Sequence, residues 1–165
     1  MKVPKPNIKR NILHKNKYNR IGLANSKIKR IVWYKRQYSY EDLWAFFNGV
    51  PCSSVGNKKF YLNETAHFII KKDGTIIQCL PLDESYTYNN EVKNDAISIT
   101  LSGDNITEEQ YLSMINLGSW LCQEFKLDPR KDNFKFEDML NKQQWVNFKR
   151  TQYYRIKEFK NKFWL

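Results

Sequence analysis

The sequence holds few residues that could bind a metal ion or act as a nucleophile. Its two histidines are His14, in a basic segment, and His67, in an alternating apolar segment. Its three cysteines, Cys52, Cys79 and Cys122, are widely separated and form no CxxC pair, which argues against a disulfide framework and a zinc ribbon. We therefore expect free, buried thiols, a hydrogen-bonded structural role for His67, no metal site and no cofactor.

Positive charge is the stronger chemical signal, because it is unevenly distributed along the chain. Residues 1–36 contain 12 Lys or Arg and no acid, residues 37–141 contain 9 bases and 16 acids, and residues 142–165 contain 7 bases and one acid. These counts give the formal net charge of +11. The sequence therefore predicts a mildly acidic body between two basic ends.

The basic N-terminal end has the composition of a nucleic-acid-binding segment. Its cations could neutralise successive phosphates, while Tyr18, Trp33, Tyr34 and Tyr38 could stack on exposed bases. The candidate nucleic-acid-binding residues are Lys9, Arg10, Lys15, Lys17, Arg20, Lys27, Lys29, Arg30, Lys35 and Arg36. No helix-turn-helix or zinc-finger pattern is present, so RNA or a ribonucleoprotein is favoured over duplex DNA. The alternative is a solvated tail that only keeps the protein soluble.

The basic C-terminal end allows two interpretations. It extends the same binding surface, or it solvates the outer face of a terminal helix. Its cations are Lys142, Lys149, Arg150, Arg155, Lys157, Lys160 and Lys162.

The elements that position these residues follow from apolar patterns and turn signals. Ser39 and Thr107 have the spacing of helix caps, and an Asp-Gly pair at residue 73 is typical of a hairpin turn. The expected strands cover residues 31–34, 66–71, 75–80 and 96–101. Strands followed by helices predict an α/β fold, with a mixed central sheet flanked by helices.

The length of 165 residues fits one compact domain. We expect a basic N-terminal arm over residues 1–30 and a single domain over residues 31–165 that ends in a basic helix. No stretch approaches the roughly 18 apolar residues of a membrane span, and no signal peptide is visible. We therefore expect a cytoplasmic protein of a bacterial host cell that does not contact the membrane.

Three segments, in order, resemble one known family. Residues 65–78 resemble the hairpin of type 2 N-acetylmuramoyl-L-alanine amidases, whose fold is shared with peptidoglycan-recognition proteins. Residues 94–101 resemble the central strand of that family, and residues 106–111 resemble the start of its long helix. The resemblance covers about residues 31–140 and implies an amidase-like fold.

The same resemblance implies a zinc ion held by two histidines and a third His, Cys or Asp. The first ligand position carries Tyr34 and Lys35, the second carries Phe136, and no His or Cys follows Cys122 to supply the third. We therefore expect that the chain is not a zinc amidase.

Two further positions of the family pattern also differ. Thr100 stands where a glutamate is often found in the central strand, and Ala66 stands where some phage members carry a tyrosine. His67 matches the pattern but is not a metal ligand in that family.

These observations favour a phage-type inhibitor that acts on RNA or a ribonucleoprotein, by analogy with a phage relative of this fold that inhibits an RNA polymerase. The specific expectation is an anti-CRISPR protein that occludes the guide RNA of an RNA-guided CRISPR nuclease or promotes its cleavage. His14, Tyr18 and Arg20 are the candidates for such cleavage chemistry. The alternatives are a residual peptidoglycan amidase or cell-wall binding protein, a protein-binding inhibitor of a polymerase, and a module that binds only proteins.

Overall fold

The computed structural model describes residues 2–15, 27–131, 134–136 and 140–161, of which residues 134–136, 160 and 161 are described by their backbone alone. The central element is a six-stranded sheet in the order β1-β6-β5-β9-β2-β10, which is parallel except between β5 and β6. Its strands are β1 (Ile8–Arg10), β2 (Arg30–Arg36), β5 (Phe68–Ile70), β6 (Ile76–Gln78), β9 (Ala96–Ser102) and β10 (Phe134–Phe136).

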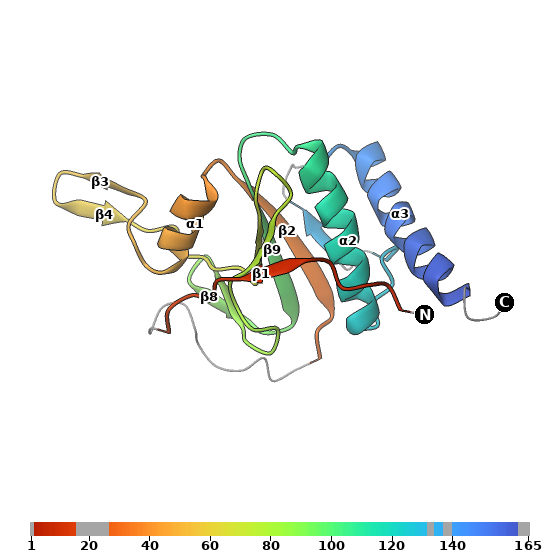
Figure 1. The fold of residues 1–165 in the computed structure, drawn as a ribbon. Helices are drawn as coiled ribbons and strands as arrows, with labels where there is room; N and C mark the ends of the chain where they lie inside the picture. The colour runs from red at the N-terminus through yellow and green to blue at the C-terminus, as the bar shows by residue number, and fades with distance from the viewer. Residues whose placement is uncertain (1, 16–26, 132–133, 137–139, 162–165) are drawn as a thin grey trace.

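Three helices and two small hairpins complete the described chain (Figure 1). The helices are α1 (Tyr40–Phe47), α2 (Glu108–Glu124) and α3 (Lys142–Asn161), and the hairpins are β3 (Ser53–Val55) with β4 (Lys58–Phe60) and β7 (Tyr86–Tyr88) with β8 (Glu91–Lys93). Within these residues no helix has the length and apolar character needed to span a membrane. The expected mixed sheet with flanking helices is confirmed.

The sheet is covered on both faces, which explains why every residue of β9 is buried. On one face, Trp33 and Ile99 pack with Leu117 of α2 and Phe148 of α3. Figure 1 shows α2 and α3 side by side on this face. The other face packs against α1 and the loops before and after β5 and β6, with its own apolar cluster around Leu43.

The expected turn and helix starts are confirmed. Gly74 adopts a φ of 86°, which glycine tolerates best, and its N–H donates to the carbonyl of Lys71 at 2.9 Å. Thr107 caps α2 by accepting from the Gln110 N–H at 3.1 Å, while the Gln110 side chain accepts from the Thr107 N–H. The paired segments of the hairpin are shorter than expected, because regular pairing covers only β5 and β6.

The basic N-terminal segment lies against the body. β1 pairs with β6, and the flanking Val3 and Leu13 are buried with 2% and 1% of their surfaces exposed. The Leu13 N–H also donates to the Cys79 carbonyl at 2.9 Å. Apolar residues between the cations anchor this segment, so residue 30 does not separate an arm from the body within the described residues.

Candidate functional site

The carboxyl end of β2 carries Tyr34, the position that the resemblance assigns to the first zinc ligand. Tyr34 pairs in register with Thr100 of β9, and only 7% of its surface is exposed. Its ring stacks on the ring of Tyr88, with centroids 4.8 Å apart and planes 15° apart. The face of the sheet at this position is therefore filled by aromatic rings.

The Tyr34 hydroxyl is held in its protonated form. It donates a hydrogen bond to the Tyr86 hydroxyl, which lies on the same hairpin strand as Tyr88. Burial raises the pKa of Tyr34 strongly, and the neighbouring Tyr86 and Tyr88 raise it further. Burial also raises the pKa of Tyr86 to about 12. Both phenols are neutral hydrogen-bonding groups at ordinary pH.

A buried ion pair lies beside this aromatic cluster. The Arg36 Nε donates to Glu64 Oε1 at 2.9 Å, and the two side chains are 16% and 5% exposed. The Arg36 guanidinium also lies 5.2 Å from the centroid of the Tyr34 ring. A positive charge is thus fixed by the protein itself at the carboxyl end of β2.

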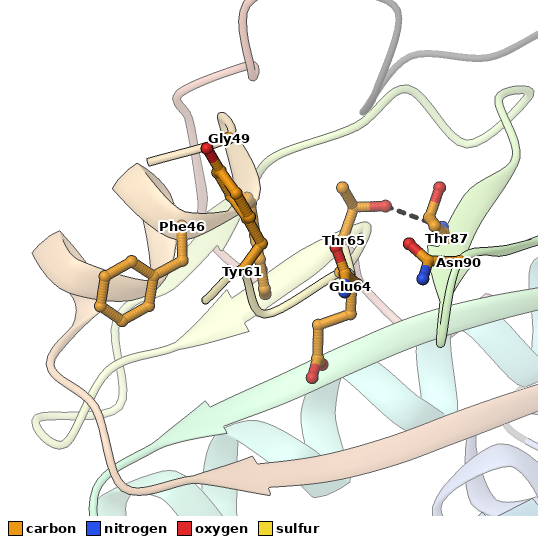
Figure 2. A pocket seen from close by; sticks show the side chains of 9 residues that line it. Phe46, Gly49, Tyr61, Glu64, Thr65, Thr87 and Asn90 are labelled. Atoms are coloured by element: carbon orange, nitrogen blue, oxygen red, sulfur yellow. Dashed lines mark hydrogen bonds between the residues drawn. The ribbon is translucent and has the colours of Figure 1, made fainter. Parts of the chain in front are cut away.

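Glu64 also lines a cavity of about 300 Å³ between α1 and the β7–β8 hairpin, shown in Figure 2. The lining combines aromatic, carboxylate, hydroxyl and amide groups. Its residues are Phe46, Phe47, Gly49, Tyr61, Asn63, Glu64, Thr65, Thr87 and Asn90. The Thr87 N–H donates to Thr65 Oγ1 at 2.8 Å, a bond that holds one wall of the cavity to the next.

Left-handed backbone marks the rim of this cavity. Asn63 and Asn90 have φ values of 54° and 63°, and the neighbouring Asn89 has 50°. Asparagine tolerates this region better than most residues with a side chain. The Asn90 N–H donates to the Asn63 carbonyl at 3.4 Å, so the two rim segments are joined.

The described residues around Tyr34 do not fit a zinc ion. Zinc in proteins prefers thiolate, imidazole and carboxylate ligands, whereas Tyr34 offers a neutral phenol and Thr100 a buried hydroxyl. Across the described ranges, no group of three His, Cys, Asp or Glu side chains is arranged to hold a metal ion. β10, which contains Phe136, runs beside β2 with Phe136 in register with Trp33.

His67 has the structural role expected from the sequence. It is fully buried, its Nδ1 accepts from the Ser98 N–H at 3.1 Å, and its Nε2 lies 2.7 Å from the Glu84 carbonyl. These partners assign the neutral tautomer with the proton on Nε2. Burial lowers the pKa of His67 to about 4.

Of the three candidates for cleavage chemistry, His14 lies among the described residues. His14 is exposed, its backbone N–H donates to Asn48 Oδ1, and its ring makes a T-shaped contact with Trp44 with centroids 5.2 Å apart. Tyr18 and Arg20 lie outside the described residues.

Among the described residues, the candidate nucleic-acid-binding cations form two groups, those with a partner in the protein and those that are exposed. Arg36 pairs with Glu64, Arg30 pairs with Asp95 at 3.3 Å, and Lys35 donates to a backbone carbonyl. The exposed members are Lys9, Arg10, Lys15, Lys27 and Lys29. Lys17 and Arg20 lie outside the described residues.

The expected stacking aromatics need correction. Trp33 has no exposed surface and Tyr34 is buried, so neither ring can stack on a nucleic-acid base. Tyr38 packs against Phe46 of α1. Strand β2 lies between β9 and β10 and is covered on both faces, which is why its aromatics belong to the core.

Sequence reasoning missed the cavity lined by Glu64 and the asparagines. These residues lie in loops with no periodic pattern, and the cavity forms only when segments near residues 46, 63 and 90 meet. The pair Asn89-Asn90 between two short strands is the one turn signal that could have indicated it.

The expected thiols are free. Cys79 and Cys122 are buried as expected, whereas Cys52 beside the β3–β4 hairpin is partly exposed.

Similarity to known proteins agrees with this architecture. Residues 24–152 match the family described as N-acetylmuramoyl-L-alanine amidase, Amidase_2. No curated protein matches the chain. Among solved structures, a mutant endolysin from Bacillus subtilis is 18% identical with a TM-score of 0.62, and the alignment covers 88% of this chain and 98% of that one.

Two other solved structures have the same fold. The N-acetylmuramoyl-L-alanine amidase endolysin LysCS from Clostridium intestinale URNW is 22% identical with a TM-score of 0.53, covering 76% of this chain and 80% of that one. Drosophila peptidoglycan recognition protein SA is 13% identical with a TM-score of 0.52, covering 78% and 79%. At these identities the likenesses establish the fold alone. Because the family match spans residues 24–152, most of its length, the chain belongs to the N-acetylmuramoyl-L-alanine amidase family, Amidase_2.

Proposed function

We propose that this chain is a peptidoglycan-binding member of the amidase family that binds a muropeptide in the cavity beside Glu64 and does not hydrolyse it by the zinc route. The observation that carries the proposal is the contrast between two neighbouring places. The position that the family resemblance assigns to the first zinc ligand holds the neutral, buried Tyr34, and an open cavity lies beside it.

The cavity has the chemistry that a glycopeptide requires. Tyr61 and Phe46 offer ring surfaces to the apolar faces of sugars, and 48% of Tyr61 is exposed. Asn63 and Asn90 place amide groups at the rim, where hydroxyl, acetamido and peptide groups can pair with them. Glu64, held by its ion pair with Arg36, adds a carboxylate to the lining.

Calorimetric titration with a soluble disaccharide-peptide tests the proposal. Tyr61→Ala removes a ring from the cavity and is expected to weaken binding about tenfold, or about 1.4 kcal/mol. Leu112→Ala is the matched control, because Leu112 is 56% exposed on α2 and does not line the cavity. Equal affinities of the two variants, or no binding by the unmodified protein, would contradict the proposal.

Hydrolysis is tested separately. The unmodified protein, supplied with zinc, is expected to leave the muropeptide intact and to hold less than stoichiometric metal by elemental analysis. Amide cleavage that depends on bound zinc would establish a residual amidase instead, with ligands supplied by residues outside those described around Tyr34.

A second candidate function is inhibition of an RNA-guided CRISPR nuclease through its guide RNA. The observation that favours it is the exposure of Lys9, Arg10, Lys15, Lys27 and Lys29 on a segment that carries no acid. The pairing of β1 with β6 holds this N-terminal segment against the sheet, so the backbone that carries these cations is fixed in place.

Because β1 belongs to the sheet, the test uses charge neutralisation rather than deletion of the segment. The unmodified protein is compared with Lys9→Gln, Arg10→Gln and Lys15→Gln combined, each incubated with the nuclease and its guide RNA on a gel. Inhibition that vanishes in the combined variant supports the RNA route. Inhibition of a polymerase, or capture of a protein with no RNA contact, would identify a protein-binding inhibitor.

A further inference from the structure

A second cavity lies on the opposite side of the sheet from Tyr34, where the C-terminal end of α2 meets α3. Its volume is about 720 Å³, within the range of ligand pockets. It is lined by the last residues of α2, the following loop up to Arg130, and Tyr153, Ile156 and Lys157 of α3. No residue of the cavity beside Glu64 contributes to it.

The two basic ends of the sequence meet at this cavity. The Val3 N–H donates to Gln123 Oε1 at 2.8 Å, and Gln123 lines the cavity. Two residues further along, the Lys5 ammonium lies 5.2 Å from the centroid of the Trp120 ring on α2. Figure 1 shows the N-terminal segment running across α2. Cations that are far apart in sequence therefore share one surface.

The charges that line the cavity are mainly positive. Lys126, Arg130 and Lys157 face a single carboxylate, Asp128. Asp128 binds Arg130 through two contacts of 3.1 and 2.8 Å, and the Arg130 side chain lowers the pKa of Asp128 to about 2. That pairing leaves Lys126 and Lys157 as net positive charge, and Lys2 and Lys5 are exposed on the neighbouring segment.

The cavity and the adjoining surface of α3 also offer flat groups. The Arg130 guanidinium lies 4.0 Å from the centroid of the Tyr153 ring, and 56% of the Arg130 side chain is exposed. Tyr154, next to Tyr153 on α3 but outside the lining of the cavity, contacts Tyr153 edge to face, with ring centroids 5.5 Å apart, and is 57% exposed. Exposed guanidinium and phenol planes are surfaces on which single-stranded bases stack.

We propose that this cavity and the adjoining surface of α3 bind single-stranded RNA, with Lys126 and Lys157 against phosphates, Arg130 against a base in the cavity and Tyr154 against a base beside it. This inference rests on the second candidate function, since both require RNA binding, but it places the contact on other residues. Charge alone would suit any polyanion, including a phosphodiester polymer of the cell wall. The exposed planes at Arg130 and Tyr154 favour a ligand with bases.

Fluorescence anisotropy with a labelled oligouridylate of about 12 nucleotides tests the site on the full chain. Lys126→Glu with Lys157→Glu is expected to weaken binding at least about tenfold and to reduce the salt slope by about 0.7 for each lost phosphate contact. The matched control is Lys58→Glu with Lys59→Glu, on the exposed β3–β4 hairpin that Figure 1 shows at the other end of the molecule. Thermal unfolding of both variants checks that they fold.

A separate variant tests the role of base stacking. Tyr154→Ala is expected to weaken oligouridylate binding about fivefold or more and to leave binding of inorganic polyphosphate unchanged. Polyphosphate that competes as well as oligouridylate at equal charge, with no effect of Tyr154→Ala, would overturn the assignment to RNA in favour of a general polyanion site.

The outcomes separate this inference from the second candidate function. Binding that survives the Lys126 and Lys157 changes but is lost when Lys9, Arg10 and Lys15 are neutralised would overturn the cavity and keep the candidate. Absence of RNA binding by the unmodified protein would overturn both.

Discussion

The ring of Tyr34 stacks on the ring of Tyr88 at a centroid distance of 4.8 Å, although the two residues are more than fifty positions apart in sequence. The Tyr34 hydroxyl also donates to Tyr86 on the same strand as Tyr88. These contacts join β2 to the β7–β8 hairpin. In this member of the amidase family the position is therefore part of the core that supports the neighbouring cavity.

Two replacements of Tyr34 are expected to destabilise the fold by different amounts. Tyr34→Ala removes a buried ring and should lower the free energy of unfolding by about 3–5 kcal/mol. Tyr34→Phe keeps the stacked ring but loses the hydroxyl bond to Tyr86, which should cost about 1 kcal/mol. Urea denaturation measures both changes, and Tyr61→Phe on the exposed Tyr61 is the control. A Tyr34→Ala protein as stable as the unmodified one would show that this cluster does not support the core.

The Arg36–Glu64 pair should contribute far more to stability than an exposed pair. Glu64→Ala leaves the mostly buried Arg36 without this carboxylate and is expected to cost about 3 kcal/mol. Glu91→Ala is the matched control, because Glu91 is 70% exposed and solvent screens its pair with Lys93, so its loss should change stability little. Denaturation in low and high salt measures both variants. Equal losses would mean that the Arg36–Glu64 pair is screened by solvent.

His67 should make the protein less stable in mild acid. Its pKa is about 4 in the folded chain and about 6.5 when unfolded, so between these values the unfolded chain binds a proton that the folded chain does not. Its contribution is fully present above pH 6.5 and is lost as the pH falls toward 4, by about 3 kcal/mol.

The control for this pH dependence is His67→Gln, whose amide can still accept from Ser98 and donate to Glu84 without titrating. The difference in unfolding free energy between the two proteins is measured from pH 7.5 to 4, so that carboxylates cancel. A constant difference across that range would exclude His67 as the titrating group.

Gly74 is expected to be intolerant of a side chain because of a tertiary contact as well as its φ. A Cβ at Gly74 would lie 2.9 Å from the Glu109 carbonyl, whereas a Cβ at Gly56 would meet nothing within 4 Å. Both glycines have positive φ, so Gly56→Ala isolates the backbone strain. Gly74→Ala should cost more than Gly56→Ala by about 1–3 kcal/mol in thermal unfolding. Equal costs would show that α2 yields to the added methyl group.

Local features of the fold could be predicted from the sequence, because the residues that determine them are close together in the chain. The turn at Asp73 and Gly74 and the capping box of Thr107 and Gln110 each involve residues at most three positions apart. The structural role of His67 also followed, since an isolated histidine in an apolar strand needs hydrogen-bond partners when buried. The family resemblance then supplied the order of the central elements.

The site depended on the tertiary structure, because its residues meet only after distant segments pack. From the sequence, Tyr34 is a candidate for stacking on RNA. In the structure β2 is covered on both faces, so Tyr34 is a core residue. Asn63 and Asn90 carry no pattern of their own and become a cavity rim only beside α1.

The sequence by itself determined the elements of an amidase-like fold, the lack of a usual zinc ligand at Tyr34, and a chain with two basic ends. Each of these is a property of residue type or of short spacing. Only the tertiary structure decided that the N-terminal basic end is anchored by Val3 and Leu13, and that it meets the C-terminal end beside α2. The physical reason is that burial of apolar side chains brings distant segments together. The position of the charged residues in space is therefore determined by the apolar residues beside them in the chain.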